Sequence, residues 1–344
     1  MPLNKRLENG SVSGLLTKMM RSEIFVLLIA LVLLCVIVSC LSPVFLTTRN
    51  IMTTLRQVSL TAICGFGLTL IILVGEIDLS VGSAQAVAGL VMVLVLNSTG
   101  SIVLGIITAL LVGAVYGAIN GILVTAGKLN SLIATLGTMA IWRGACMVTT
   151  NAVSIQSTVP QFQELATGFV GPFPNALLMA VAVYIALYYM LNKTTFGRYL
   201  YAIGGNQEAA RLSGLPVARM KVIVYIISGM LTMFAGVLLS SRMASAQPTA
   251  GTGFEMVVIA SIILGGVSLS GGIGTIAGAL LGMLILGVLQ NGLTLLDVSS
   301  FWQDITRGLL IIIAVFLDAR RKDSVVKRLL REQKKQEGSE QAAL

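Results

Sequence analysis

The sequence contains no histidine among its 344 residues, and only 11% of the residues are charged. Without histidine, the chain lacks the commonest general acid and base and the commonest metal ligand. Hydrophobic residues make up 56% of the sequence, so a soluble globular domain is excluded, because too little polar surface is available to face water. This composition is typical of a membrane protein with several spanning helices.

Cysteine is scarce, and catalytic motifs are missing. Cys35, Cys40, Cys64 and Cys146 lie in apolar runs and form no C-x-x-C pair, so we interpret them as packing residues. Neither H-E-x-x-H nor G-x-S-x-G spacing occurs, which disfavours an intramembrane enzyme.

A nucleotide site is missing as well. The nearest approach to a phosphate-binding loop runs from Gly121 to Lys128, but its spacing is wrong, and Leu129 stands where Mg²⁺ coordination needs Ser or Thr. We therefore expect no catalytic residue, metal site or cofactor in this chain.

Apolar runs that are long enough to cross about 30 Å at about 1.5 Å per residue predict ten transmembrane helices in an all-α polytopic membrane protein. The polar start at 1–23 is followed by an apolar run, 24–41, without a cleavage pattern, so we expect a retained first span and not a signal peptide. The chain then divides into an N-terminal segment 1–23, a transmembrane domain 24–317 and a charged tail 318–344. The predicted spans are 24–42, 60–75, 79–97, 101–126, 131–149, 175–192, 221–240, 254–269, 273–290 and 301–317.

The basic residues predict the orientation. Segment 1–23 holds four Lys and Arg, position 128 one, segment 193–221 five and the tail 318–344 eight, together 18 of the 23, while the loop 151–174 holds none. By the positive-inside rule, both termini and the segment 193–221 face the cytoplasm, and the loop 151–174 faces outward. Because the basic residues flank spans, the net charge of +9 does not indicate a nucleic-acid partner.

Two predicted spans look broken. The second ends in GEIDLSVG from Gly75 to Gly82, where Asp78 or Ser80 could cap a new helix. The eighth has a short apolar run before the glycine-rich stretch 265–274, which predicts a half-helix and a turn. Irregular backbone at membrane depth is tolerated only where it packs in protein or lines a cavity.

A weak internal repeat appears when the chain is shifted by 171 residues. The shift maps the fourth predicted span onto the ninth, an odd number of crossings, so the two halves would have inverted orientations, as in transporters that pass substrate between halves. It pairs Asn120 with Asn291. These asparagines could contact the transported molecule or only bond helices to one another.

The segment 193–221 is the longest polar stretch between two apolar ones. Within it, 206–212 predicts a short helix, because Asn206 can cap its start, Gly214 can end it and Pro216 forbids its continuation. Such a helix offers a docking surface for a soluble partner. A loop that simply packs on the membrane face is the alternative.

The residues leave three transport classes open, namely a channel, an ion-coupled carrier and one subunit of a pump. Ion coupling needs buried carboxylates, and the candidates are Glu76, Asp78, Glu255 and Asp304. A docking helix in the largest predicted cytoplasmic loop favours the pump subunit, because an external motor needs such a contact.

Several long motifs, in the same order, resemble the ribose-type permeases of ATP-binding-cassette sugar importers. The resemblance covers nearly the whole chain apart from the two tails. It departs at Glu76, where that family most often has a small residue, and this puts substrate preference in doubt. The motifs are TTFGRYLYAIGGNQEAARLSGL from Thr194, PVARMKVIVYIISG from Pro216, GEIDLSVGS from Gly75, LNSLIATLGTMAIWRG from Leu129, SAQPTAGTGFEMVVIASIILGGVSLSGGIGT from Ser245 and NGLTLLDVSS from Asn291.

The resemblance implies a permease of the bacterial inner membrane that dimerises with a second copy or a close paralogue in the lipid. It implies a cytoplasmic ATPase that binds ATP and Mg²⁺, and a periplasmic binding protein that delivers a monosaccharide such as ribose. Expected pathway residues are Asp78, Ser80, Gln85, Asn120 and Asn291. The expected ATPase-coupling residues are Gly205, Asn206, Gln207, Glu208, Ala209, Ala210, Arg211, Leu212, Ser213 and Gly214.

Overall fold

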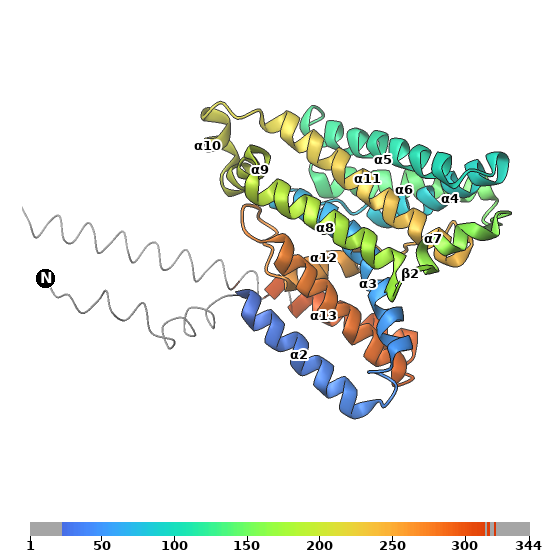
Figure 1. Cartoon of the computed structure of the whole chain (residues 1–344). Coiled ribbons are helices and arrows are strands. Elements are labelled where there is room, and N and C mark those ends of the chain that lie inside the picture. Colours follow the sequence, from blue (N-terminus) through green and yellow to red (C-terminus); the bar gives the residue numbers. More distant parts are fainter. Residues whose placement is uncertain (1–22, 314, 317–319, 321–344) are drawn as a thin grey trace, which may run out of the picture.

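The computed structural model describes residues 23–313, 315, 316 and 320, which form a bundle of helices (Figure 1). The segment 1–23 and the tail 318–344 lie almost entirely outside the described residues. The elements are α2 (Glu23–Leu41), α3 (Thr48–Leu73), α4 (Val81–Thr99), α5 (Ile102–Thr125), α6 (Ser131–Thr150), β1 (Ile155–Gln156), η3 (Pro160–Gln163), α7 (Glu164–Thr167), β2 (Phe169–Val170), β3 (Phe173–Pro174), α8 (Asn175–Lys193), α9 (Thr195–Gly205), α10 (Gln207–Leu212), α11 (Val217–Met243), β4 (Ser245–Ala246), α12 (Phe254–Leu264) and α13 (Ile276–Leu295).

Eight of the described helices are long and apolar enough to cross a membrane. Two of the ten predicted spans are not among them: α12 has only 11 residues, and the helix at 300–313 borders positions that are not described. An all-helical, multi-span fold is thus confirmed, and α12 is the predicted half-helix.

Helices α3, α4 and α11 form the centre of the bundle. The most apolar stretches of α3 and α4 are 78% and 72% buried, whereas that of α2 at the periphery is 6% buried. Helix α11 packs on α3, α4 and α5. Glycine allows this, because a Cβ added at Gly113 of α5 would lie 2.8 Å from the carbonyl oxygen of Gly229 in α11, and small residues let helix backbones approach closely.

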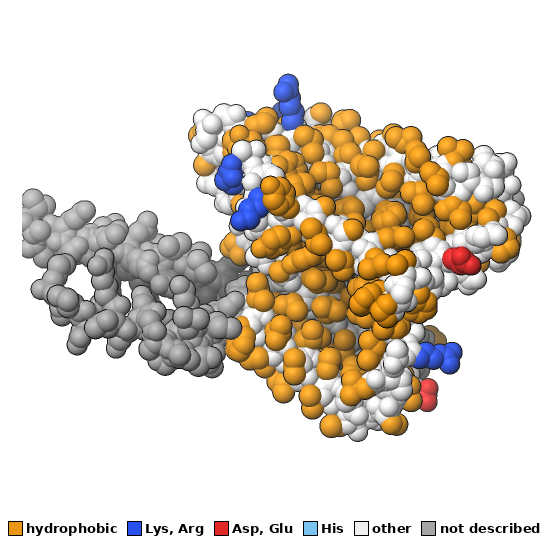
Figure 2. All heavy atoms as spheres, viewed as in Figure 1, with side chains coloured by type: hydrophobic (Ala, Val, Ile, Leu, Met, Phe, Trp, Pro, Cys, Tyr) orange, Lys and Arg blue, Asp and Glu red, His pale blue; other side chains and the backbone are white. Residues whose placement is uncertain are grey.

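The outer surface of the bundle has the character of a membrane-facing wall. In Figure 2, apolar side chains cover the flank between the two ends, and Lys and Arg side chains gather at the end where α9 and α10 lie. A further basic side chain lies at the other end in this view, and an apolar flank bounded by charged residues is the distribution that bilayers select.

Helix α3 begins twelve residues before the predicted span. Thr47 caps its first turn by accepting a hydrogen bond from the backbone N–H of Asn50. The prediction was wrong here because Arg49 and Arg56 interrupt the apolar pattern. Arg56 is accommodated inside the helix, since it donates to the carbonyl of Thr167 at 2.6 Å and lies 4.3 Å from the ring centre of Phe169.

The end of the bundle opposite α10 is folded from the two connections 151–174 and 244–253. Strands β1 and β4, one from each connection, pair antiparallel with Ile155 opposite Ala246. Arg143 of α6 donates to the carbonyl oxygens of Pro248 and Ala250 at 2.6 and 2.7 Å. These contacts hold the loop before α12 against the bundle.

Candidate functional site

The predicted short helix exists as α10, and its capping is as expected. The side chain of Asn206 accepts a hydrogen bond from the N–H of Ala209 at 2.9 Å. At the other end, Gly214 adopts a φ of 83°, and the N–H of Leu215 bonds the carbonyl of Ala210 at 3.1 Å. This is the Schellman arrangement, which needs the left-handed conformation that glycine tolerates.

The rest of the predicted cytoplasmic segment differs from the prediction. A second helix, α9, precedes α10, and α11 begins at Val217, so that Arg219 and Lys221 belong to α11 and not to a loop. The sequence prediction missed α9. Only the extended backbone of Thr194 separates α9 from α8, and its side chain makes no capping hydrogen bond that would mark a new helix.

Helix α10 buries one side chain and exposes its other residues. Ala210 is buried at 6% exposure, while Glu208 and Arg211 form an exposed ion pair at 3.1 Å. Leu212 is 79% exposed, which is unusual for a large apolar side chain at the end of a capped helix. The exposed coupling residues are Gly205, Asn206, Gln207, Glu208, Ala209, Arg211, Leu212, Ser213 and Gly214.

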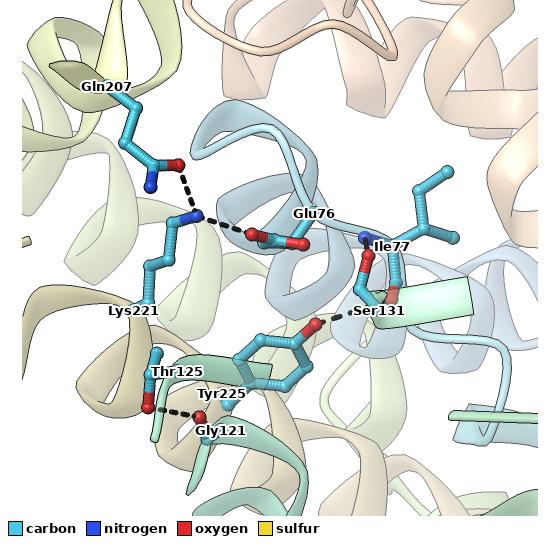
Figure 3. A network of polar contacts seen from close by, with 8 residues as sticks. All are labelled: Glu76, Ile77, Gly121, Thr125, Ser131, Gln207, Lys221 and Tyr225. Atoms are coloured by element: carbon cyan, nitrogen blue, oxygen red, sulfur yellow. Dashed lines mark hydrogen bonds and ion pairs between the residues drawn. The ribbon is translucent and has the colours of Figure 1, made fainter. Parts of the chain in front are cut away.

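An ion pair connects α10 and α11 to the break between α3 and α4 (Figure 3). The ammonium of Lys221 contacts the carboxylate of Glu76 and donates to the side-chain oxygen of Gln207 at 2.7 Å. The two charged side chains are only 6% and 13% exposed. A displacement of α10 would therefore reach Glu76 through a single shared cation.

Hydroxyl groups from two helices hold the break itself (Figure 3). Ser131 of α6 accepts from the N–H of Ile77 at 3.3 Å, and Tyr225 of α11 donates to the carbonyl of Ile77 at 3.3 Å. One turn further along α6, Thr135 accepts from the N–H of Leu79 at 3.1 Å. The irregular backbone is satisfied inside the protein, as membrane depth demands.

The glycine-rich turn after α12 touches the same region through backbone alone. The N–H of Gly272 donates to the carbonyl of Leu73 at 2.9 Å, and a Cβ added at Gly272 would lie 2.6 Å from the nitrogen of Gly205. A Cβ at Gly271 would lie 2.7 Å from the nitrogen of Gly75. Thus the end of α9, the end of α3 and the turn before α13 meet without intervening side chains.

A cleft of about 690 Å³ opens beside this contact. Its wall carries the basic side chains of Lys128, Arg211 and Lys221 and only one carboxylate, that of Glu76. The cleft lies between α10, α11 and the connection from α5 to α6, at the end of the bundle that the sequence predicts to be cytoplasmic.

Three of the predicted pathway residues lie together in a closed polar cluster. Asp78 accepts from the N–H of Ser80 at 2.8 Å and from its hydroxyl, and Asn120 donates to the Ser80 hydroxyl at 2.9 Å. Tyr116 also contacts Ser80. All four side chains are at most 1% exposed. This arrangement fastens α5 to the start of α4.

The expected helix cap is different in detail. Ser80 occupies the N-cap position of α4 but makes no side-chain cap hydrogen bond, because its hydroxyl is directed to Asp78. The carboxylate of Asp78 binds the N–H of Ser80, which precedes the helix.

The other two predicted pathway residues, Asn291 and Gln85, have different surroundings, and among the described residues neither forms a hydrogen bond with the cluster. Asn291 of α13 exchanges two hydrogen bonds with Asn50 of α3, at 3.0 and 2.8 Å. Asn291 and Asn120 thus have unlike partners. Gln85 of α4 is 2% exposed and lines a second cavity of about 250 Å³ towards the opposite end of the bundle.

The sequence analysis did not identify Lys221 and Tyr116, and it used Glu76 only as an ion-coupling candidate and as a departure from a family pattern. Two charges of opposite sign at the ends of predicted spans, Glu76 after the second and Lys221 at the seventh, are a signal for such a pair, because unpaired charges are costly there. Their separation of 145 positions in the sequence conceals their proximity.

The chain matches the family model described as branched-chain amino acid transport system / permease component over residues 50–315. It is 44% identical to the ribose import permease protein RbsC of Escherichia coli (strain K12) over 299 residues, which cover 86% of this chain and 93% of that protein. It is 45% identical to the RbsC of Bacillus subtilis (strain 168) over 295 residues, covering 85% of this chain and 92% of that protein.

A third relative is the L-arabinose transport system permease protein AraH of Escherichia coli (strain K12), which is 39% identical over 278 residues, with 80% of this chain and 84% of that protein covered. No solved structure matches the chain. The chain therefore belongs to the branched-chain amino acid transport system / permease component family, as a multi-pass transport subunit of the bacterial inner membrane that catalyses no reaction itself.

Proposed function

We propose that this chain is the permease subunit of an ATP-binding-cassette importer for a pentose such as ribose or arabinose. The proposal is supported by relatives named for ribose and arabinose import at 39–45% identity. In the importer, a separate ATPase binds ATP and Mg²⁺, and a periplasmic binding protein delivers the sugar.

The coupling step is assigned to α10. A capped helix with an exposed Leu212 suits docking to a soluble ATPase, and the shared ammonium of Lys221 offers a route from α10 to the helix break at Glu76. The route through Lys221 is the single observation that carries this coupling assignment. The backbone contact of Gly272 with Gly205 is a second route, towards α12 and α13.

The orientation and assembly follow from this assignment. With α10 facing the cytoplasm, both termini face the cytoplasm, and the loops 151–174 and 244–253 face the binding protein. Two permease copies, identical or closely related, flank one passage. ATP hydrolysis shifts α10, and inverted halves rock between outward and inward access.

An ion-coupled carrier is the weaker alternative. It would need Asp78 to exchange an ion with water, yet Asp78 is 1% exposed and lines neither the 250 Å³ cavity nor the 690 Å³ cleft. The hydrogen bonds from Ser80 and Asn120 suit a positioning role.

Reconstitution separates the two functions. Permease alone in liposomes with an imposed proton or sodium gradient should accumulate no radiolabelled ribose or arabinose. Addition of the ATPase, the binding protein and ATP should start uptake. Gradient-driven uptake by the permease alone would contradict the proposal.

A further inference from the structure

A polar cavity of about 250 Å³ lies at the end of the bundle opposite α10. Its wall is built from α3, α4, the last turn of α11, the loop before α12, α13 and the helix at 300–313. This volume is far above the roughly 10–15 Å³ that one water molecule needs in a cavity, so the cavity has room for a small polar ligand. The mouth carries exposed residues, among them Arg242 and Thr252.

Three glutamines from three helices converge on this cavity: Gln57 of α3, Gln85 of α4 and Gln290 of α13. Thr61 adds a hydroxyl one turn beyond Gln57. An amide offers both a donor and an acceptor, so a cluster of amides can match the hydroxyl pairs of a sugar. Recognition sites in proteins commonly place a few such convergent polar groups in a concave wall.

Gln85 provides an independent sign of a missing partner. Its side chain is 2% exposed, and its oxygen Oε1 has no hydrogen-bond partner among the described residues. An unpaired buried acceptor costs about 1–3 kcal/mol unless a ligand or water satisfies it. Gly251 packs tightly against α4 at this point, because a Cβ added to it would lie 2.3 Å from the carbonyl oxygen of Gly82 and 3.1 Å from Oε1 of Gln85.

The charges at the cavity fit a neutral ligand. With its amide oxygen turned toward Arg307, Gln290 accepts from that guanidinium at 2.7 and 3.0 Å, and Asp304 pairs with Arg307 at 2.8 Å. The Arg307 charge is thus compensated. Arg242 alone lies at the mouth without an ion pair among the described residues, and it is exposed to water.

We propose that this cavity is the site where the permease first receives a neutral monosaccharide during import. Gln85 and Gln57 both line it, and Gln85 is the more buried of the two. The proposal deepens and rests on the proposed function, because it names the place at which that substrate is bound. The amides replace the water that the sugar loses, and the site needs only weak affinity, since the sugar must leave it again.

The test uses the complete importer in proteoliposomes, with permease, ATPase and binding protein, and follows radiolabelled ribose uptake and ATP hydrolysis in the same samples. Gln85→Leu and Gln57→Leu remove the amides at similar size. Each should reduce uptake about tenfold, the factor of one lost hydrogen bond of about 1.4 kcal/mol, while ATP hydrolysis stays within about twofold of wild type. Asn192→Leu, which removes an amide at an exposed position of α8, is the control and should transport normally.

Two results would overturn the site. One is wild-type uptake in both variants; the other is a parallel loss of uptake and ATP hydrolysis, which would assign Gln85 and Gln57 to packing. Failure of the proposed function is a separate result, because wild-type importer would then take up neither ribose nor arabinose.

A second measurement does not depend on the glutamines. Thr252→Cys places a thiol at the exposed mouth, and a membrane-impermeant, charged thiosulfonate added outside should block uptake by this variant but not by wild type, while the binding protein still co-purifies with the modified permease. Complete modification of Thr252→Cys with unchanged uptake would also overturn the proposal.

Discussion

Breaking the ion pair between Lys221 and Glu76 tests the connection between α10 and the helix break. Removal of one partner of a fully buried pair costs about 3–5 kcal/mol, because the other charge is left uncompensated. These side chains are 6% and 13% exposed and border the 690 Å³ cleft, so water offsets part of this loss. We expect Glu76→Gln to reduce the free energy of unfolding by about 2 kcal/mol.

The assay is the melting temperature of the detergent-solubilised permease. At about 2 °C per kcal/mol for a chain of this size, Glu76→Gln should lower the Tm by about 4 °C. The double variant Glu76→Gln/Lys221→Met removes the stranded ammonium and should melt higher than Glu76→Gln alone. Glu208→Gln is the matched control, since its pair with Arg211 is exposed, and it should shift the Tm by about 1 °C or less.

The outcome that refutes the reasoning is specific. If Glu76→Gln melts within 1 °C of wild type, or if the double variant loses as much as Glu76→Gln and Lys221→Met measured separately and added together, the pair does not stabilise the contact between α10 and the break. Uptake by the reconstituted importer should fall in both Glu76→Gln and the double variant, because neither retains the ion pair that joins α10 to the break.

The remaining predictions concern neighbouring contacts. Gly272→Val forces a branched side chain onto the backbone of Gly205 at a φ of 71°, so uptake should fall at least tenfold while the ATPase still co-purifies; normal uptake would contradict the contact. Asp78→Asn keeps an acceptor for the N–H it binds, and uptake should fall less than about threefold; complete loss would favour an ion-carrying role. Ala210→Trp or Glu208→Lys should leave membrane insertion intact but abolish ATPase co-purification, and retained uptake would count against the docking helix.

Local chemistry was sufficient to predict α10. Asn206, Gly214 and Pro216 act on the backbone within a few residues of themselves, so both its start and its end follow from the sequence. The broken second span and the half-helix α12 follow in the same way, because charge and glycine interrupt apolar runs.

Contacts between distant segments could not be predicted in this way. Lys221 and Glu76 are 145 residues apart, and the sequence around each of them does not indicate that the other is its partner. The expected symmetry of Asn120 and Asn291 was likewise inferred only from their positions in the sequence. Their partners, Ser80 and Asn50, depend on how the helices pack.

Arginine misled the assignment of helix boundaries for a related reason. In the hydropathy pattern, the charge of Arg56 indicates the end of a span. In the structure, its guanidinium donates to the carbonyl of Thr167 and lies over the ring of Phe169, and these contacts offset the cost of placing the charge in α3. These contacts come from a loop more than 100 residues away in the sequence, so a hydropathy pattern cannot indicate them.

The most direct test of the account is the side of the membrane on which α10 lies. Leu212→Cys, in a chain whose four native cysteines are replaced by serine, places one thiol at a position that is 79% exposed. A membrane-impermeant maleimide should label it in inside-out vesicles, with labelling suppressed when the ATPase is bound, and should leave it unlabelled in right-side-out vesicles. Labelling in right-side-out vesicles would place α10 beyond the reach of any cytoplasmic ATPase.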